Sequence, residues 1–524
     1  MTNLIPLDAN AINALRTSVS WTIPELMVLF GAITILAIEA LAGPRLRKST
    51  EPIVALLTTG FAFLTNLLLH ANSAPFDIHD YAFNGMIAID AVTGILRAII
   101  LATLFIGFLF TLRHQIWNGI RSEYYSLAMF AAVGAILMVE ASHLIVLVLG
   151  LEILSLPLYT LAALRKRDSR SKEAALKYFV LGSLASAVLI FGLMLIYGGA
   201  GSIDYRQLYQ PQLNPALYTI GALFVLVGLL FKGGLMPFYV WSPDVYEGAP
   251  DAVVGLMAAL AKVGAFGALI RLAGPFVTAI PGVLLSSLAI VAGLTMLFGN
   301  LLALAQNNLK RLLAYSSVAH AGYLLLGILA ATKANTLSLG LSAVLFYLGT
   351  YLLTIVAAFA LIAHLQGRDG HWTIDDLEGA GNRHPGFAFT LTVLLLSLGG
   401  IPPLAGFFGK AYIFHAAMGA GLEGWAVFGV LTSVMSVYYY LRVIVAMYFK
   451  PEKVPLVLDT TGGAPRLASN LVVLYLFLLG LVPGLFYGPA WQASRWEGRG
   501  RPFPEARGPN AAVESAVKAI YGPK

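Results

Sequence analysis

Five ionisable residues lie near the middle of long apolar runs: Glu152, Lys232, Lys262, His320 and Lys410. A charge at the centre of a bilayer costs from about 2.5 to more than 10 kcal/mol, so such residues must pair, hydrate or change protonation. Burial weakens the hold of a lysine on its proton, and a neighbouring carboxylate strengthens that hold. A row of lysines with a glutamate at one depth is therefore suited to relaying protons, and separating one pair would gate the relay.

The alternative interpretation is that each residue makes a satisfied polar contact that holds helices together. That account suits a lone His320, but it suits three lysines and a glutamate at one depth poorly. Glu140, at the end of its run, is a secondary candidate for the relay. Arg442 follows three tyrosines and is explained by snorkelling to the interface, while Asp90 is predicted to be interfacial. No role is predicted for four other charged or titratable residues inside the spans, Glu25, Glu39, Arg97 and His415.

Composition indicates what surrounds these residues. Of 524 residues, 58% are hydrophobic and only 11% are charged, whereas a soluble domain has roughly 25% charged residues. A helix needs about 20 apolar residues to cross a bilayer, and runs of that length recur throughout the chain. We therefore predict an all-α polytopic membrane protein with a short N-terminal lead-in and a loosely ordered tail over 489–524. Its fourteen predicted spans are 22–42, 52–70, 88–112, 124–141, 143–164, 176–197, 215–241, 251–273, 281–305, 310–330, 336–363, 385–419, 424–448 and 466–488.

Two spans contain helix breakers. Span twelve would be about 52 Å long as one helix, but Gly399-Gly400-Ile401-Pro402-Pro403 interrupts it. Span seven is interrupted at Gly233-Gly234, with Pro237 close behind. Broken spans beside lysines are typical of transporters with inverted repeats, although glycines that merely allow close packing are the alternative.

Spans 4–8 and 9–13 would then form two five-helix repeats, the second one inverted. The predicted regions are the N-terminal helices (1–123), the first repeat (124–275), the second repeat (276–448) and the last helix with its tail (449–524).

Lysine and arginine gather in the odd-numbered loops, whereas the even-numbered loops hold only Arg206, Arg271 and Lys333. Because positive loops stay in the cytoplasm, the odd loops are predicted to be cytoplasmic and both termini to lie outside. The basic tail alone runs against this rule. The odd-loop residues are Arg45, Arg47, Lys48, Arg113, Arg121, Arg165, Lys166, Arg167, Arg170, Lys172, Lys310, Arg311, Arg368, Arg383, Lys450, Lys453 and Arg466.

Several functions are excluded. A chain without cysteine has no disulfide, zinc ribbon or cysteine-ligated iron–sulfur cluster. No predicted strand is followed by Gly-x-Gly-x-x-Gly and a helix, so the chain is not expected to bind NADH. Its net charge of +7 is spread over short loops, which gives no nucleic-acid signature, and quinone chemistry on this chain alone is not expected.

At these residues the sequence resembles the antiporter-like membrane subunits of respiratory complex I. The resemblance covers spans five to thirteen, while the N-terminal spans match mainly in hydropathy and the tail does not match. The matching segments are 150–158 (GLEILSLPL), 173–178 (EAALKY), 231–238 (FKGGLMPF), 241–250 (WSPDVYEGAP), 308–323 (NLKRLLAYSSVAHAGY), 406–410 (GFFGK) and 439–443 (YYLRV).

The resemblance implies a role for each buried ionisable residue. Glu152 and Lys232 would interact as a pair, Lys262 would be the central relay, and Lys410 would end the proton path. His320 would join the polar axis between the repeats.

The resemblance also implies a larger assembly. The chain would lie in a bacterial inner membrane beside other membrane and peripheral subunits, with no cofactor of its own. NADH, FMN, iron–sulfur clusters and quinone would be bound by those other subunits. One position departs from the family, because Tyr239 stands where a histidine is usual, and this weakens a proton-shuttling role there.

Two other functions compete with this one. A subunit of a multi-subunit sodium/proton antiporter would share the fold, although the segment 244–250 (DVYEGAP) favours the complex I relatives. A membrane scaffold without a proton path is disfavoured by the lysines at mid-membrane depth.

Overall fold

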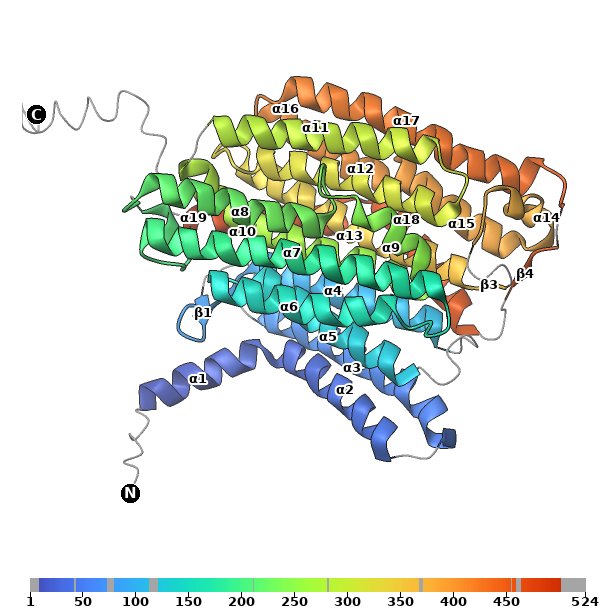
Figure 1. Ribbon diagram of the computed structural model, residues 1–524, viewed down its shortest axis with the longest axis horizontal. Helices are drawn as coiled ribbons and strands as arrows, with labels where there is room; N and C mark the ends of the chain where they lie inside the picture. Colours follow the sequence, from blue (N-terminus) through green and yellow to red (C-terminus); the bar gives the residue numbers. More distant parts are fainter. Residues whose placement is uncertain are drawn as a thin grey trace, which may run out of the picture.

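The computed structural model describes residues 9–41, 44–72, 80–112, 121–210, 212–279, 282–366, 371–453, 455–458 and 463–500. Almost all of these residues are helical, and most helices run side by side along one direction of the molecule (Figure 1). Two short antiparallel hairpins, β1–β2 and β3–β4, complete the fold.

The N-terminal part precedes the first predicted repeat. Helices α1 and α2 diverge from the main bundle in Figure 1, whereas α4 lies within it. Its elements are α1 (Ala9–Trp21), α2 (Ile23–Leu41), α3 (Pro44–Asn72), β1 (Asp80–Ala82), β2 (Ile87–Ile89) and α4 (Ala91–Thr111).

The segments predicted as repeats follow. The first contains α5 (Arg121–Glu140), α6 (Leu144–Ala162), α7 (Ser169–Ala200), the 3-10 turn η2 (Gln207–Tyr209), α8 (Pro215–Gly233), α9 (Trp241–Gly248) and α10 (Asp251–Ala279). The second contains α11 (Val283–Leu304), α12 (Leu309–Ala330), α13 (Leu337–Ala363), β3 (Leu365–Gln366), η4 (Asp375–Leu377), α14 (Ala380–Arg383), α15 (Pro385–Gly399), α16 (Ala405–Gly419) and α17 (Glu423–Phe449). The chain continues through β4 (Val457–Leu458), α18 (Gly463–Leu481) and α19 (Gly484–Gly500).

Within the described residues, 13 helices are long and apolar enough to cross a membrane. They correspond to thirteen of the predicted spans, and the pair α15 and α16 accounts for the remaining one. The predicted all-α polytopic class and its set of spans are therefore confirmed.

Both predicted helix breaks are present. Helix α8 ends at Gly233 and α15 ends at Gly399, and the next residues, Gly234 and Gly400, have φ values of 72° and 80°. Glycine adopts this left-handed conformation without the steric cost that a Cβ brings, so it ends a helix in this way. Each break thus leaves helix-end carbonyl groups inside the protein.

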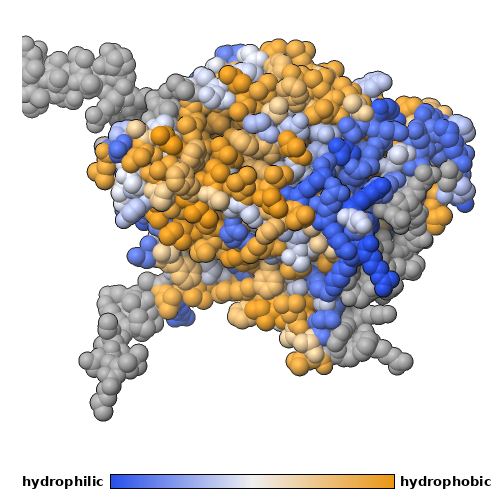
Figure 2. Space-filling model, in the orientation of Figure 1, coloured by the Kyte–Doolittle hydropathy of each residue, from blue (hydrophilic) through white to orange (hydrophobic). Residues whose placement is uncertain are grey.

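Helices α10 and α13 form the centre of the bundle, since the apolar window of each is 100% buried. Helices α2, α3 and α7 are the opposite case, with about a third or less of their windows buried. Hydrophobic residues cover much of the visible side surface in Figure 2, whereas hydrophilic residues gather toward one end. An apolar side surface of this kind suits contact with lipid.

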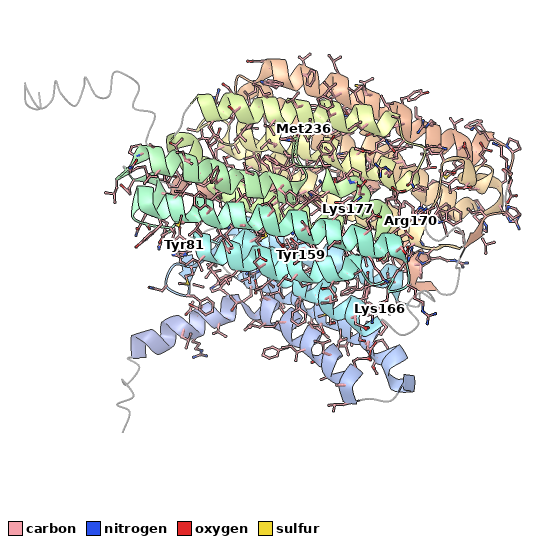
Figure 3. The ribbon with its side chains drawn as sticks, viewed as in Figure 1. Tyr81, Tyr159, Lys166, Arg170, Lys177 and Met236 are labelled. Carbon is pink, nitrogen blue, oxygen red and sulfur yellow. The ribbon has the colours of Figure 1, made fainter. Side chains whose placement is uncertain are left out.

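The odd-numbered loops meet at that hydrophilic end. Ion pairs join Lys166 to Glu123 at 3.7 Å and Arg383 to Glu452 at 3.1 Å, each linking two of these loops or the helix starts beside them. Lys166 and Arg170 lie at this end in Figure 3, and Tyr81 of the β1–β2 hairpin lies toward the other. Helices α1 and α19 also lie toward the other end (Figure 1). These positions agree with the prediction that the odd-numbered loops lie on one side of the membrane. That this side is the cytoplasmic one stays a prediction.

The prediction of a loosely ordered tail from residue 489 is wrong for its first part, because α19 extends to Gly500. Ala490, Ala493 and Ser494 are buried, and they form one small-residue face of this helix. Ser494 Oγ donates a hydrogen bond to the carbonyl oxygen of Ser338 in α13 at 3.1 Å. The polar composition of this segment gave no indication that one face of the helix is buried. Residues 501–524 lie outside the described part of the chain.

Candidate functional site

Four of the five predicted site residues are buried inside the bundle. Lys232 comes from α8, Lys262 from α10, His320 from α12 and Lys410 from α16. Glu152, in α6, is half-buried. The site therefore runs across the bundle on helices that are distant in sequence.

Lys232 lies in the last turn of α8, where serine and tyrosine side chains surround it. Its Nζ donates hydrogen bonds to Ser155 Oγ at 2.6 Å and to the hydroxyl of Tyr178 at 3.4 Å. The same nitrogen is 5.4 Å from the ring centre of Tyr178 and 5.6 Å from that of Tyr159. Such cation–π contacts stabilise an ammonium group away from water.

Glu152 and Lys232, which the resemblance implies to be an interacting pair, are not in direct contact. Among the described residues no ion pair joins them, although the two side chains interact electrostatically. Glu152 Oε1 is buried without a hydrogen-bond partner. The hydrogen bond from Lys232 Nζ is accepted instead by Ser155 Oγ, nearly one turn further along α6. The carboxylate is thus close to Lys232 but not engaged with it.

Lys262 and Lys410 each bind the end of a broken helix. Lys262 Nζ donates to the carbonyl oxygen of Gly233 at 3.1 Å, and Lys410 Nζ donates to that of Gly399, also at 3.1 Å. The last carbonyl groups of a helix lack partners within it and carry partial negative charge. Both breaks therefore supply acceptors that compensate a buried ammonium group.

Lys410 has a second hydrogen bond, to Ser433 Oγ of α17 at 2.9 Å. Its Nζ also lies 5.3 Å from the ring centre of Tyr323. Lys262 lies 6.0 Å from the ring centre of Tyr351.

His320 lies between these two lysines. Its ring centre is 4.9 Å from that of Tyr351 and 6.0 Å from that of Tyr323. His320 Nδ1 is hydrogen-bonded to the hydroxyl of Tyr347, and Nε2 to that of Tyr440 at 3.3 Å. Both lysines interact electrostatically with the imidazole, so the three residues form one coupled group.

Sequence reasoning missed the buried tyrosines and their polar partners. Tyr439 donates to Asn300 Oδ1 at 3.1 Å, and Asn300 Nδ2 donates to the Tyr323 hydroxyl at 3.2 Å. Tyr351 donates to Ser317 Oγ at 2.8 Å. A tyrosine or serine hydroxyl both donates and accepts, as a proton-passing chain requires. The only sequence signal was tyrosine inside apolar runs, which also suits simple packing.

The secondary candidates lie elsewhere. Tyr239 is half-buried in the segment between α8 and α9, where its ring packs against Tyr315. Glu140 is the last residue of α5, and it binds Arg97 rather than Lys232, Lys262 or Lys410. His415 is exposed, and Arg442 donates to the carbonyl oxygens of Leu304 and Gln306 at the end of α11.

Asp90 begins α4 and forms an ion pair with Arg271 at 2.8 Å. Within the part of the chain that the structure describes, no group of three or more histidine, aspartate or glutamate residues could hold a metal ion.

Comparisons with known proteins agree with this fold. Residues 141–436 match the family described as NADH:quinone oxidoreductase/Mrp antiporter, TM. A protein of Granulibacter bethesdensis named NADH-quinone oxidoreductase subunit N is 39% identical over 444 residues, which are 82% of this chain and 90% of that protein.

Solved structures show the same likeness. A chain from the structure titled respiratory complex I from Thermus thermophilus with bound Aureothin is 35% identical, with 89% of this chain and 99% of that chain covered and a TM-score of 0.76. A chain of the Mrp complex from Dietzia sp. DQ12-45-1b, 20% identical, superposes with a TM-score of 0.77 over 90% of this chain and 97% of that chain, which shows a shared fold.

Together the helices, the breaks and the matched family define a multi-pass membrane protein. The chain belongs to the NADH:quinone oxidoreductase/Mrp antiporter family, and within it to the group of proteins named NADH-quinone oxidoreductase subunit N.

Proposed function

We propose that the chain is a proton-translocating membrane subunit of an NADH-quinone oxidoreductase. The observation that carries this proposal is the buried row from Lys232 through Lys262 and His320 to Lys410, in a chain that resembles subunit N over most of its length. Electron transfer would take place on other subunits of the assembly, which would hold NADH, FMN, iron–sulfur clusters and quinone. This chain would contribute the proton path and no redox centre.

The proton would move through groups that already lie next to one another. Lys262 faces the ring of Tyr351, Tyr351 packs on His320, and His320 is coupled to Lys410 beside Tyr323. Ser155 and Tyr178 would stabilise Lys232 while it holds a proton.

Glu152 supplies the gate in this mechanism. In the present geometry Lys232 binds Ser155, and Oε1 of the Glu152 carboxylate is buried without a hydrogen-bond donor. A small shift of α6 against α8 would bring the carboxylate onto Lys232 and strengthen its hold on the proton. Return of the shift would release the proton toward Lys262.

The orientation and the repeats belong to the same proposal. The odd-numbered loops would face the cytoplasm and both termini the outside of a bacterial inner membrane. Regions 124–275 and 276–448 would be inverted repeats, a division supported by the matching helix ends at Gly233 and Gly399.

The competing function is a subunit of a multi-subunit sodium/proton antiporter. The likeness to the Mrp chain is one of fold, whereas curated relatives at 34–40% identity bear the subunit N name. Similarity in sequence therefore favours the oxidoreductase.

Purification of the chain from its native membrane tests this function. We expect it to be isolated with flavin and iron–sulfur subunits, together with quinone reduction by NADH. Isolation with small antiporter subunits and without flavin would contradict the proposal.

A further inference from the structure

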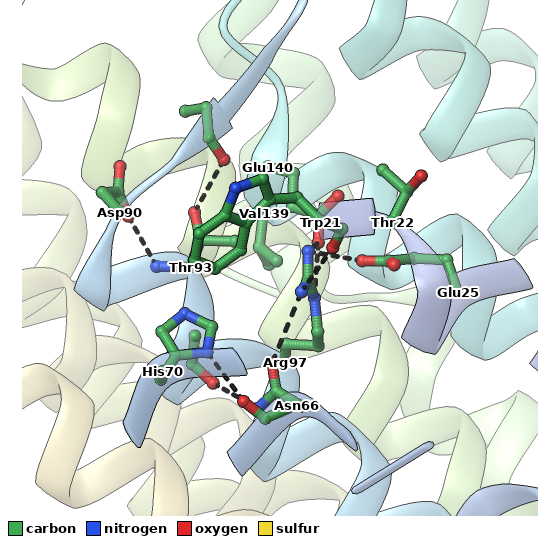
Figure 4. A network of polar contacts seen from close by, with 12 residues as sticks. Trp21, Thr22, Glu25, Asn66, His70, Asp90, Thr93, Arg97, Val139 and Glu140 are labelled. Atoms are coloured by element: carbon green, nitrogen blue, oxygen red, sulfur yellow. Dashed lines mark hydrogen bonds and ion pairs between the residues drawn. The ribbon is translucent and has the colours of Figure 1, made fainter. Parts of the chain in front are cut away.

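A second buried charge cluster lies apart from the lysine row, at the junction of α2, α4 and α5 (Figure 4). Glu25 is in the first turn of α2, Arg97 is in the second turn of α4, and Glu140 is the last residue of α5. Their relative exposures are 5%, 2% and 0%. All three are therefore removed from bulk water.

One guanidinium group serves both carboxyl groups. Arg97 Nε and Nη2 lie 2.8 and 2.5 Å from Glu140 Oε1, and Nη2 is 2.6 Å from Glu25 Oε1. The remaining Arg97 nitrogen, Nη1, donates to the carbonyl oxygen of Trp21 at 3.1 Å and to Asn66 Oδ1 at 3.4 Å. The arginine has no donor group left for the other carboxylate oxygens.

The outer oxygens of the two carboxyl groups, Glu25 Oε2 and Glu140 Oε2, are buried without a hydrogen bond. Glu25 Oε1 lies within ion-pair distance of Arg97 Nη2 but accepts no hydrogen bond. The two carboxyl groups also interact with each other. If both were ionised, the cluster would retain one uncompensated negative charge in the protein interior, which is strongly unfavourable.

Neighbouring elements do not supply the missing cation. Arg271 of α10 is engaged by Asp90, with contacts of 2.8 and 3.1 Å. His70 of α3 is hydrogen-bonded to the carbonyl oxygen of Asn66, and among the described residues no hydrogen bond or ion pair links it to either glutamate. Arg16 of α1 is exposed.

We propose that Glu25 and Glu140 hold one proton between them against Arg97, so that the three residues form a proton-binding site distinct from the lysine row. A shared proton cancels the excess negative charge and gives one carboxyl group a donor for the other. Adjacent carboxyl groups that cannot both ionise share a proton in this way.

The position of the site determines the side with which its proton exchanges. Glu25 and Glu140 lie beside the helix ends where α1 meets α2 and where the β1–β2 hairpin packs, with the Phe83 amide donating to Ser18 Oγ at 3.1 Å. By the predicted orientation this end faces outside. The proton would therefore exchange with the outer aqueous phase.

Infrared difference spectroscopy tests the site, because a protonated carboxyl group absorbs apart from an ionised one. We would compare the purified assembly carrying the native chain with assemblies carrying Glu25→Gln, Glu140→Gln or Glu39→Gln. Glu39 is the matched control, since it is on the same helix and accepts a hydrogen bond from Ser122. We expect one protonated-carboxyl band to disappear in each of the first two variants and to persist in the third.

Each single substitution leaves one carboxylate on Arg97, so we expect assembly to be retained. If either variant fails to assemble, the other variant carries the test, because each substitution is expected to remove the same band. Absence of a protonated-carboxyl band at neutral pH would overturn the proposal. So would a carboxylate band that responds to Na⁺ in place of choline without any protonated band, because the site would then bind a cation.

Discussion

Lys262 Nζ lies 3.1 Å from the carbonyl oxygen of Gly233, the residue at which α8 ends. The same relationship recurs between Lys410 and Gly399 at the end of α15. In both cases a glycine with positive φ follows the acceptor, so that the helix stops while its carbonyl group points at a buried lysine. The breaks are thus part of the lysine environment and not only a packing device.

Replacement of Gly400 by alanine tests this relationship. Left-handed backbone costs a residue with a Cβ roughly 1–2 kcal/mol, and the new Cβ would lie 3.0 Å from Lys410 Cδ. We expect Gly400→Ala to lower both the thermal stability of the assembly and its proton pumping. Gly386→Ala, in the first turn of α15 with open space around the added Cβ, is the control and should leave both unchanged. Normal pumping by Gly400→Ala would separate the break from lysine function.

The Glu152 gate predicts a ranking of two substitutions. Glu152→Gln keeps the shape of the side chain but removes the charge that would attract Lys232, so pumping should fall strongly. Glu152→Asp keeps the charge on a shorter arm and should retain part of the activity. Pumping is to be measured at matched levels of assembled protein. The reverse ranking, with glutamine tolerated and aspartate inactive, is what a purely structural residue would give.

The orientation predicts where introduced cysteines react, and this cysteine-free chain is a suitable background. Ser169 is the first residue of α7, and Ser202 lies just beyond the other end of this helix. We expect a cysteine at Ser169 to react with a membrane-impermeant reagent only from the cytoplasmic side, and one at Ser202 only from outside. Labelling of position 169 from outside would invert the whole assignment.

Asp244 joins three helices at the hydrophilic end, through Lys177 of α7 and Arg311 of α12 at 3.0 and 2.9 Å. Although its partial burial acts in the opposite direction, the hydrogen bonds from Lys177 and Arg311 hold the pKa of Asp244 below its usual value. A lowered carboxyl pKa adds stability above the unfolded-state value of about 3.9, and that stability is lost as pH falls below it through the folded-state pKa.

Asp244→Asn should therefore lower the melting temperature at neutral pH slightly, since a partly exposed pair contributes below about 1 kcal/mol. The difference from the native chain should shrink as the pH falls through the acidic range. A difference that stays constant with pH would show that the ion pairs contribute nothing.

The sequence allowed the spans, the breaks and the depth of the lysines to be predicted. Apolar length specifies where a chain crosses a membrane, and paired glycines near prolines specify where a crossing helix stops. Both are local properties. Once the apolar runs are delimited, the positions of Lys262 and Lys410 within them indicate that both lysines lie near mid-membrane.

The contacts of these lysines could not be predicted in the same way. That Ser155 rather than Glu152 receives the Lys232 hydrogen bond depends on the rotation of α6 against α8, and no local pattern encodes it. The docking of α19 and the Glu25–Arg97–Glu140 cluster also depend on helices meeting from distant parts of the chain. A polar tail and isolated charges in apolar runs do not identify their partners.

Proton pumping by a Lys410→Met assembly tests the central claim most directly. Methionine fills similar space but cannot hold a proton or bind the Gly399 carbonyl group. Protons moved per NADH oxidised by quinone are to be measured in sealed vesicles, beside Lys453→Met, which changes an exposed lysine. We predict that Lys410→Met assembles, oxidises NADH with an artificial acceptor as the native protein does, and loses pumping and coupled quinone reduction. An assembled Lys410→Met protein that pumps as well as the Lys453→Met control would contradict the account.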